Sequence, residues 1–199
     1  MGYSMEQLKD LREKTGAGIS DCKNALEEAK GDMEEAVKVL RTKGLATAAK
    51  KAGRAAKEGL IGYYIHHNNK VGVMVEIRCE SDFVAKTPQF QELAKDVSMQ
   101  IAAMSPRFVK VEDVSAEIIE AEKAIYREQL KDDKKPAAVI DKIIEGKVNK
   151  FFEDTVLMEQ VFVKDNTKKV KDLLGAVVAA LAENIQIHRF VRYQVGEEA

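Results

Sequence analysis

The amino-acid sequence predicts an α+β protein in which helices come first, a β-hairpin follows, and one more strand comes last. Three observations lead to this prediction. Residues 4–44 repeat apolar side chains at helical spacing, residues 61–79 alternate apolar and polar side chains, and residues 185–195 alternate again after a long helical stretch. We therefore expect a small three-stranded antiparallel sheet packed with helices, preceded by a separate helical domain.

The first 44 residues predict three short helices. Ser4 and Gln7 form a capping box that begins the first helix, the second begins at Ile19, and the third ends near Gly44. A core made from so few residues is only marginally stable by itself. Such a domain leaves apolar side chains uncovered, and we expect these to contact a partner.

A basic segment follows this helical domain. Residues 45–57 are alanine-rich and helix-prone, and six positive charges between Arg41 and Lys57 occur with no acidic residue among them. The segment is interpreted as a basic helical linker, either a solvated connector or a surface that touches an acidic patch or RNA. The predicted organisation is a docking domain (1–44), this linker, and an α+β core (58–199).

The core begins with a predicted β-hairpin that has one buried face. Ile61, Tyr63 and Ile65 alternate with other residues in its first strand, a turn follows at 68–70, and residues 71–79 alternate in its second strand. The terminal run of alternating residues supplies a third strand that could join this sheet. Between the hairpin and that strand, helices are expected at residues 88–104, 115–130, 136–151 and 168–183.

Composition and motifs argue against most enzymes and against a general nucleic-acid binder. Lysine plus arginine (32) balances aspartate plus glutamate (33). The sequence contains no phosphate-binding loop, dinucleotide glycine motif or zinc-protease motif. Cys22 and Cys79 are expected to be buried thiols, and the three histidines do not have the spacing of metal ligands. We expect a cytoplasmic, non-enzymatic protein with no cofactor, no metal and no membrane segment.

One short segment has the features of an interaction site. Residues 80–86 follow the most apolar strand and precede the helix that begins at Pro88. Ser81 can cap a single turn, which would raise Asp82 and Phe83 on an exposed rim. A carboxylate beside an aromatic ring suits an interface hot spot. The alternative is that Phe83 folds inward and Asp82 only assists the cap.

Several stretches resemble the elongation factor Ts family. Residues 11–26 look like the N-terminal signature of that family, and residues 81–86 (Ser-Asp-Phe-Val-Ala-Lys) are similar to its Thr-Asp-Phe-Val-Ala core motif. Residues 112–117 and 189–196 also resemble the family, in the expected order. The resemblance therefore covers nearly the whole chain.

The resemblance implies a guanine nucleotide exchange factor for elongation factor Tu, a translational GTPase. A ubiquitin-associated-like three-helix domain would dock on the GTPase near the turn that carries Arg12, Ile19 and Ser20. Phe83 would wedge between switch-region helices, while Asp82 and its neighbours disturb the magnesium site. The residues that the resemblance assigns to GDP release are Ser81, Asp82, Phe83 and Val84.

The sequence departs from the family pattern at two positions. Ser81 stands where threonine is usual, a change that keeps the capping hydroxyl. Gln100 stands where family members often carry histidine, which puts a contribution of that side chain to phosphate-loop contact in doubt. Longer members have a duplicated core, whereas this chain has one copy. We therefore expect a homodimer that uses an exposed sheet edge.

Two other functions remain open at this point. The three-helix domain could bind a helix or a ubiquitin-like surface, which would make the chain an adaptor without exchange activity. Residues 41–57 could instead bind RNA, with steep salt dependence. Substitution of Asp82 and Phe83 separates the adaptor from the exchange factor, because an adaptor does not need them.

Overall fold

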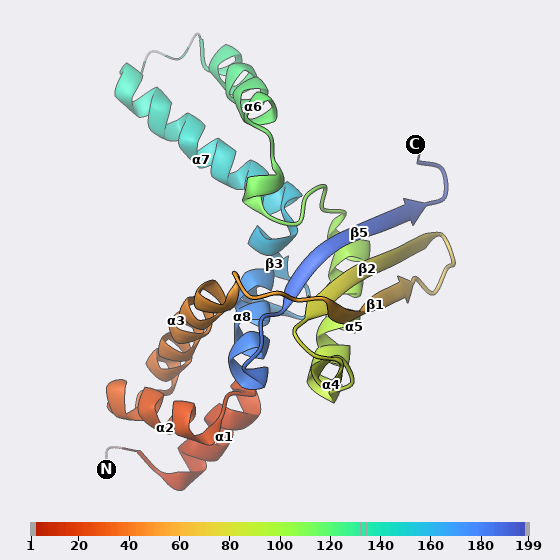
Figure 1. The fold of residues 1–199 in the computed structure, drawn as a ribbon. Coiled ribbons are helices and arrows are strands. Elements are labelled where there is room, and N and C mark those ends of the chain that lie inside the picture. The colour runs from red at the N-terminus through yellow and green to blue at the C-terminus, as the bar shows by residue number, and fades with distance from the viewer. Residues whose placement is uncertain (1–2, 132, 134, 198–199) are drawn as a thin grey trace. The chain divides into compact units, whose positions relative to one another are not determined.

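The computed structural model describes residues 3–131, 133 and 135–197 (Figure 1). The order of its helices and strands confirms the predicted α+β fold. The chain divides into two compact units, one made of Met1–Met99 with Lys171–Ala199 and the other of Gln100–Val170.

The three N-terminal helices have a core of their own. They are α1 (Met5–Thr15), α2 (Ile19–Glu28) and α3 (Met33–Lys51). The predicted capping box forms. The backbone nitrogen of Gln7 donates to Ser4 Oγ at 3.1 Å, and the backbone nitrogen of Ser4 donates to Gln7 Oε1 at 2.8 Å. Met5 stands at helical spacing before Leu8 and Leu11 but is 77% exposed, so the apolar stripe of α1 that packs on the core begins at Leu8. The buried core residues are Leu11, Cys22, Ala25, Leu26, Ala29 and Ala36.

The prediction that the third helix ends near Gly44 is wrong. Helix α3 continues through Gly44 to Lys51, so the third helix and most of the predicted linker form one continuous helix. A Cβ on Gly44 would lie 3.1 Å from the carbonyl oxygen of Gly175 in α8 (Val170–Leu181). The glycine permits two helix backbones to approach closely and does not mark a helix end.

Basic side chains of this long helix have partners within the protein. Arg41 Nε lies 3.6 Å from Asp172 Oδ2, and Lys43 Nζ lies 2.6 Å from Glu28 Oε2. Within residues 45–57, Lys51 Nζ donates to the Ala182 carbonyl oxygen at 2.7 Å, and Arg54 Nη1 lies 3.4 Å from Glu80 Oε1.

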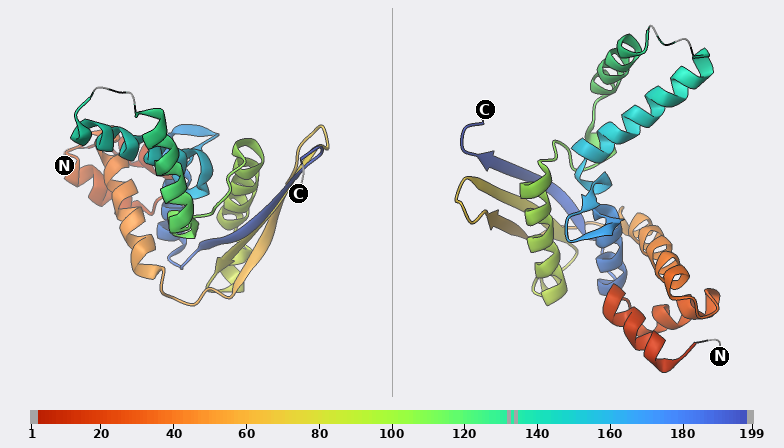
Figure 2. Two further views of the ribbon diagram at one scale, coloured as in Figure 1. Left: turned by 90° about the horizontal axis from the view of Figure 1, so that it is seen from above. Right: turned by 180° about the vertical axis from the view of Figure 1, so that it is seen from behind.

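The predicted three-stranded antiparallel sheet is confirmed. Its strands are β1 (Glu58–Ile65), β2 (Val71–Cys79) and β5 (Gln186–Gln194), in the order β1-β2-β5. Figure 2 shows α5 (Pro88–Met104) along one face of the sheet. Gly62 pairs with Val75, and a Cβ on Gly62 would lie 3.0 Å from the carbonyl oxygen of Ala94 in α5. The buried residues of β2 and of the part of α5 before residue 100 are Val73, Val75, Ile77, Cys79, Phe90, Leu93, Ala94, Asp96, Val97 and Ser98.

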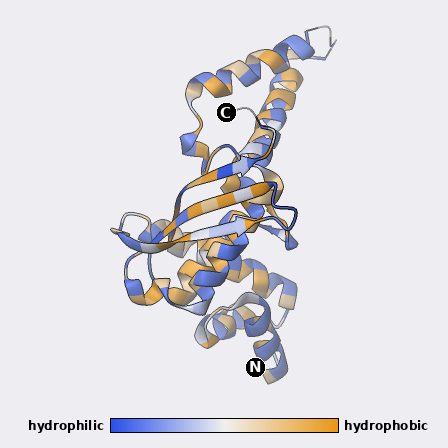
Figure 3. Cartoon of the chain, turned by 90° about the vertical axis from the view of Figure 1, so that its right-hand side faces the viewer, coloured by the Kyte–Doolittle hydropathy of each residue, from blue (hydrophilic) through white to orange (hydrophobic). Residues whose placement is uncertain are grey.

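Three apolar residues of β1, Ile61, Tyr63 and Ile65, lie on the opposite face of the sheet from these buried residues. Ile61, Tyr63 and Ile65 are 50%, 74% and 58% exposed. Tyr63 pairs with Met74, which pairs in turn with Val191, so the apolar surface crosses all three strands. In Figure 3 these strands lie in front of the helices, with apolar positions along each. The sheet is therefore apolar on both faces, and helix α5 covers one of them.

A β-bulge decides which side chains of β5 reach the uncovered face. Ile187 pairs with Ile77, but the next pair along the ladder joins Arg189 to Glu76, so β5 carries one extra residue. Side chains on the two sides of the bulge therefore exchange faces. Ile187 is buried, whereas Val191, an even number of residues further on, is 43% exposed.

The second unit carries a pair of helices, α6 (Ala116–Gln129) and α7 (Ala137–Thr155), which lie side by side (Figures 1 and 2). A hydrophobic cluster of the buried residues Val114, Phe151 and Val156 lies where α6 begins and α7 ends. A second sheet is formed by β3 (Val161–Phe162) and β4 (Asp165–Lys169). Its strands are too short to show the alternation from which a strand is predicted. Two short 3-10 helices, Val111–Asp113 and Leu157–Glu159, also lie in the described part of this unit.

Candidate functional site

The predicted single turn forms between β2 and α5. Helix α4 (Asp82–Ala85) is four residues long, and Ser81 occupies its N-cap with extended backbone angles. The Val84 amide donates to Ser81 Oγ at 3.4 Å, and Cys79 Sγ donates to the Ser81 carbonyl oxygen at 3.0 Å. Because Cys79 and Ala85 are buried, the turn is anchored at both ends to the sheet domain.

Phe83 points into solvent, with 79% of its surface exposed. The alternative in which it folds inward is therefore wrong. Of its two neighbours on the turn, Asp82 is exposed to solvent and Val84 is half-buried. Thr87 Oγ1 donates to the Val84 carbonyl oxygen at 2.7 Å and accepts from the Phe90 amide at 3.3 Å. The same threonine thus links the turn to the first turn of α5.

Asp82 forms an exposed ion pair on this turn. Lys86 Nζ lies 2.7 Å from Asp82 Oδ2, and this hydrogen bond lowers the pKa of Asp82 and raises the pKa of Lys86. The carboxylate is therefore charged at neutral pH. Exposed pairs of this kind contribute little to folding, so Asp82 can exchange Lys86 for groups on a partner at small cost.

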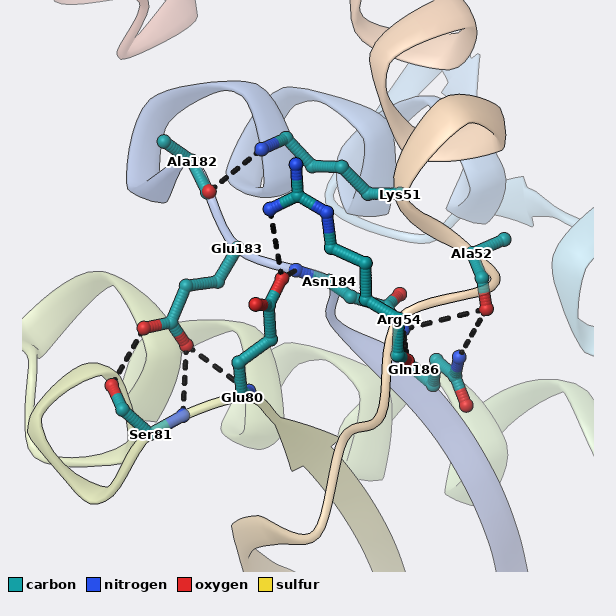
Figure 4. Close-up of polar contacts among 9 residues, drawn as sticks. All are labelled: Lys51, Ala52, Arg54, Glu80, Ser81, Ala182, Glu183, Asn184 and Gln186. Carbon is teal, nitrogen blue, oxygen red and sulfur yellow. Dashed lines mark hydrogen bonds and ion pairs between the residues drawn. The ribbon is translucent and has the colours of Figure 1, made fainter.

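The turn is held from behind by Glu183, which follows α8 (Figure 4). Glu183 Oε1 accepts from Ser81 Oγ at 2.6 Å. Glu183 Oε2 accepts from the backbone nitrogens of Ser81 and Glu80, at 3.0 and 3.1 Å. One carboxylate therefore binds three donors of the chain segment that enters α4.

Glu80, beside the turn, bonds the residue after Glu183. The backbone nitrogen of Asn184 donates to Glu80 Oε1 at 2.7 Å, and Arg54 Nη1 lies 3.4 Å from the same oxygen. The pKa of Glu80 lies below its ordinary value, first because of the Asn184 hydrogen bond and then because of the positive charge of Arg54. This carboxylate is also charged at neutral pH.

Glu183 and Asn184 were not among the predicted site residues. They lie about a hundred residues from Ser81 in the sequence, and no local pattern connects the two segments. The only available signal was a polar pair between the apolar helix α8 and the apolar start of the last strand, with Asn184 buried in the fold. Such a pair also reads as an ordinary turn.

The three residues predicted for docking by the N-terminal domain lie around one turn. Arg12 is in the last part of α1, while Ile19 and Ser20 begin α2, and all three are exposed. Gly16 ends α1 with a φ of 67°, a left-handed conformation that suits glycine. Ile19 is 58% exposed, so this turn presents an apolar side chain to solvent.

The structure places Gln100 in the interior of the second unit. Its side chain has no exposed surface. Its Nε2 donates to Gln160 Oε1 at 3.2 Å and to the Val161 carbonyl oxygen at 3.1 Å, while its Oε1 accepts from the Val163 amide at 2.9 Å. Gln100 therefore fixes the β3 segment and has no surface to offer a partner.

Across residues 3–131, 133 and 135–197, no three histidine, cysteine, aspartate or glutamate side chains are placed to hold a metal ion. Over the same residues, no helix combines the length and apolar character needed to cross a membrane. Burial raises the pKa of both free thiols, Cys22 and Cys79.

The protein combines a small helical domain with a sheet domain whose α4 turn displays a carboxylate and an aromatic ring. These features are typical of a protein that contacts a macromolecular partner. Comparison with known proteins gives the family. The elongation factor TS family model matches residues 3–197. The chain belongs to the elongation factor Ts family, and it is a translation elongation factor.

Individual relatives match over almost their full length. Elongation factor Ts of Fervidobacterium nodosum is 58% identical over 197 residues, covering 99% of this chain and 100% of the relative. That of Thermotoga neapolitana is 57% identical over 198 residues, covering 100% of both chains. That of Citrifermentans bemidjiense is 54% identical over 197 residues, covering 99% of this chain and 91% of the relative.

Proposed function

We propose that this protein is the guanine nucleotide exchange factor of elongation factor Tu and that the α4 turn drives release of GDP. The observation that carries the proposal is the exposed ring of Phe83, which a capped turn presents from a buried strand and a helix. A large apolar side chain in this position gains nothing for folding. It gains binding energy when a partner covers it.

The mechanism is a linkage between two binding reactions. GDP is retained by charge interactions with a phosphate loop and magnesium, so movement of those groups weakens its binding. Phe83 would enter between the switch-region helices of the GTPase, and the charged Asp82 would disturb the magnesium site. A factor that binds the nucleotide-free GTPase more tightly than the GDP form lowers GDP affinity by the same ratio. This chain makes and breaks no covalent bond.

The N-terminal domain would supply affinity in this scheme. Arg12, Ile19 and Ser20 lie exposed around one turn, where a guanidinium, an apolar side chain and a hydroxyl can contact the nucleotide-binding domain of the GTPase. Docking and release would then depend on different residues. Substitution of Arg12, Ile19 or Ser20 should raise the concentration of factor needed for half-maximal release. Substitution at α4 should lower the maximal rate.

Stopped-flow release of fluorescent GDP from cognate elongation factor Tu tests the proposal. Wild type should accelerate release, and the double variant Asp82→Ala/Phe83→Ala should lose most of the acceleration. The adaptor alternative predicts that both proteins bind and that neither accelerates release. An absence of acceleration by wild type contradicts the exchange function.

The expected homodimer would use the uncovered face of the sheet and not its edge. This face carries the exposed apolar residues of all three strands around an open hollow of about 500 Å³. Tyr63 and Tyr193 are each 74% exposed on it. Exposed apolar side chains that adjoin one another across three strands are typical of an interaction surface, and a second copy presents the same surface in a two-fold arrangement. The residues that line the hollow are Ile61, Tyr63, Ile65, Gly72, Val73, Met74 and Tyr193.

Sedimentation tests the dimer. Tyr193→Lys places a charge in the middle of the proposed interface and should convert the dimer to a monomer without unfolding it. Ile125→Lys, at a residue 51% exposed on α6, is the matched control and should leave the dimer intact. A wild-type protein that sediments as a monomer at micromolar concentration contradicts this part of the proposal.

In this scheme the partners are elongation factor Tu and a second copy of the chain. The place of action is the cytoplasm. The mechanism calls for no cofactor, no membrane and no direct contact with nucleic acid.

A further inference from the structure

The connection between α8 and β5, residues 182–185, is bonded to two segments that are distant from it in the sequence, 51–54 and 80–81 (Figure 4). Ala182 has a φ of 57°, a left-handed conformation that is unfavourable for alanine. Figure 4 shows Glu183 directed toward Ser81, whereas Asn184 is directed toward Ala52 and Arg54. A strained residue followed by two side chains with opposite targets is typical of a turn fixed by its surroundings.

Glu183 determines how the Ser81 hydroxyl is used. A serine hydroxyl has one proton to donate and two lone pairs to accept with. Its proton goes to Glu183 Oε1 at 2.6 Å, which leaves the lone pairs for the Val84 amide. The carboxylate therefore sets the orientation of the cap of α4. It also binds the backbone nitrogens of Ser81 and Glu80, so the chain cannot rotate at the entrance to the turn.

Asn184 holds the other side of the same connection. Only 2% of its surface is exposed. Its Nδ2 donates to the carbonyl oxygens of Arg54 and Ala52, at 2.7 and 3.5 Å, and Gln186 Nε2 donates to Ala52 at 3.1 Å. The segment that follows α3 is thus bonded to the connection that supports α4.

From this geometry we propose that Glu183 is a positioning residue for nucleotide exchange, which holds the α4 turn so that Phe83 and Asp82 meet the GTPase in a fixed orientation. The inference rests on the proposed exchange function. Glu183 itself contacts no partner in this scheme, because its carboxylate faces the backbone of the turn. Removal of the carboxylate frees the turn and leaves Phe83 and Asp82 in the chain. Binding through the N-terminal domain persists, and the maximal rate of GDP release falls.

Three substitutions separate charge, length and hydrogen bonding. Glu183→Ala removes all three bonds to the turn. Glu183→Gln keeps an oxygen for the two backbone nitrogens and should rescue most of the function. Glu183→Asp keeps the charge but is one methylene too short to reach contacts of 2.6 to 3.1 Å. Glu120→Ala, at an exposed glutamate on α6, is the control.

The first measurement is stopped-flow release of fluorescent GDP from elongation factor Tu over a range of factor concentrations. We expect Glu183→Ala and Glu183→Asp to lower the maximal rate by about tenfold or more, since misplacement of about 1 Å has effects of this order or larger. The concentration at half-maximal rate should change by less than about threefold, because docking is intact. Glu183→Gln and Glu120→Ala should stay within about threefold of wild type.

The second measurement is hydrogen exchange of the factor alone. The amides of Glu80 and Ser81 should exchange at least about tenfold faster in Glu183→Ala, with the amides of β2 unchanged. If that variant does not fold, Glu183→Asp replaces it in both measurements.

The two proposals can fail separately. If wild type does not accelerate GDP release, the exchange function is wrong and Glu183 positions nothing for it. If wild type is active but the substitutions leave the maximal rate within about twofold, or leave the Glu80 and Ser81 amides protected, the positioning role is wrong. A rise in the half-maximal concentration at an unchanged maximal rate would also contradict it, because that result places Glu183 in docking.

Discussion

Substitution of Phe83 by alanine should separate function from folding. Phe83 is 79% exposed, and a phenylalanine side chain offers roughly 200 Å² of surface. About 160 Å² is therefore available to a partner. At about 25 cal/mol per Å², complete burial of this surface would contribute about 4 kcal/mol. Because hot-spot truncations usually cost about 2 to 4 kcal/mol, we expect a loss of about 2 to 3 kcal/mol in transition-state stabilisation.

That loss corresponds to a fall of roughly 30- to 150-fold in the second-order rate constant for stimulated GDP release. The free energy of unfolding should change by no more than about 0.5 kcal/mol, because the ring makes few contacts within the chain. Stopped-flow release and urea unfolding of the same preparations measure the two quantities. Ile125→Ala, another exposed apolar truncation, is the control for both.

Two results would refute the reasoning on Phe83. Release within about twofold of wild type would show that the ring is not a contact that matters. A loss of about 2 kcal/mol or more in unfolding free energy would show that Phe83 supports the fold, and the kinetic loss could not then be assigned to the partner.

Three further predictions concern the frame behind the site. Gly62→Ala should destabilise the protein by about 1 to 3 kcal/mol, since its Cβ would press on the backbone of α5 at 3.0 Å; an unchanged unfolding midpoint would contradict the close packing. Ala182→Gly should stabilise by about 0.5 to 1 kcal/mol, because glycine relieves the left-handed φ of 57° at some cost in unfolded-state entropy; thermal unfolding measures this, and a lower midpoint would sink the idea. The pKa of Glu80 is lowered in the folded state by the Asn184 hydrogen bond, so its contribution is complete above the ordinary glutamate pKa and is lost as the pH falls through the lowered value. The chemical shift of the backbone amide of Asn184 should titrate in that acidic range in wild type and not in Glu80→Gln. A midpoint above the ordinary glutamate pKa would show that folding raises the pKa of Glu80 and does not lower it.

Local patterns in the sequence predicted the fold well where each element carried its own signal. The capping box at Ser4, the three strands and the single turn capped by Ser81 all form as expected. Prediction failed where one residue has two physical uses. Gly44 looked like a helix end because glycine is frequent there, but its actual role is close packing against Gly175. Met5 has the helical spacing of a core residue, yet 77% of it is exposed at the start of α1.

The face of a strand is a second property that local patterns left open. The alternation of β1 is clear, but alternation does not state which side is covered. The alternating residues Ile61, Tyr63 and Ile65 face away from α5. In β5 the bulge near Glu76 moves Val191 to the uncovered face. Nothing in the sequence of a single strand reveals a bulge, since it depends on the pairing with its neighbour.

The sequence by itself determined the α+β class, the order of the elements, the capped turn with its Asp82 and Phe83, and the family resemblance, because each depends on residues close together in the chain. Only the tertiary structure decided that Phe83 is exposed and that Gln100 is buried. It also decided that Glu183 supports the turn from a segment about a hundred residues away. These features depend on which segments pack together, and a carboxylate bound to three distant donors leaves no mark on the local pattern of either segment.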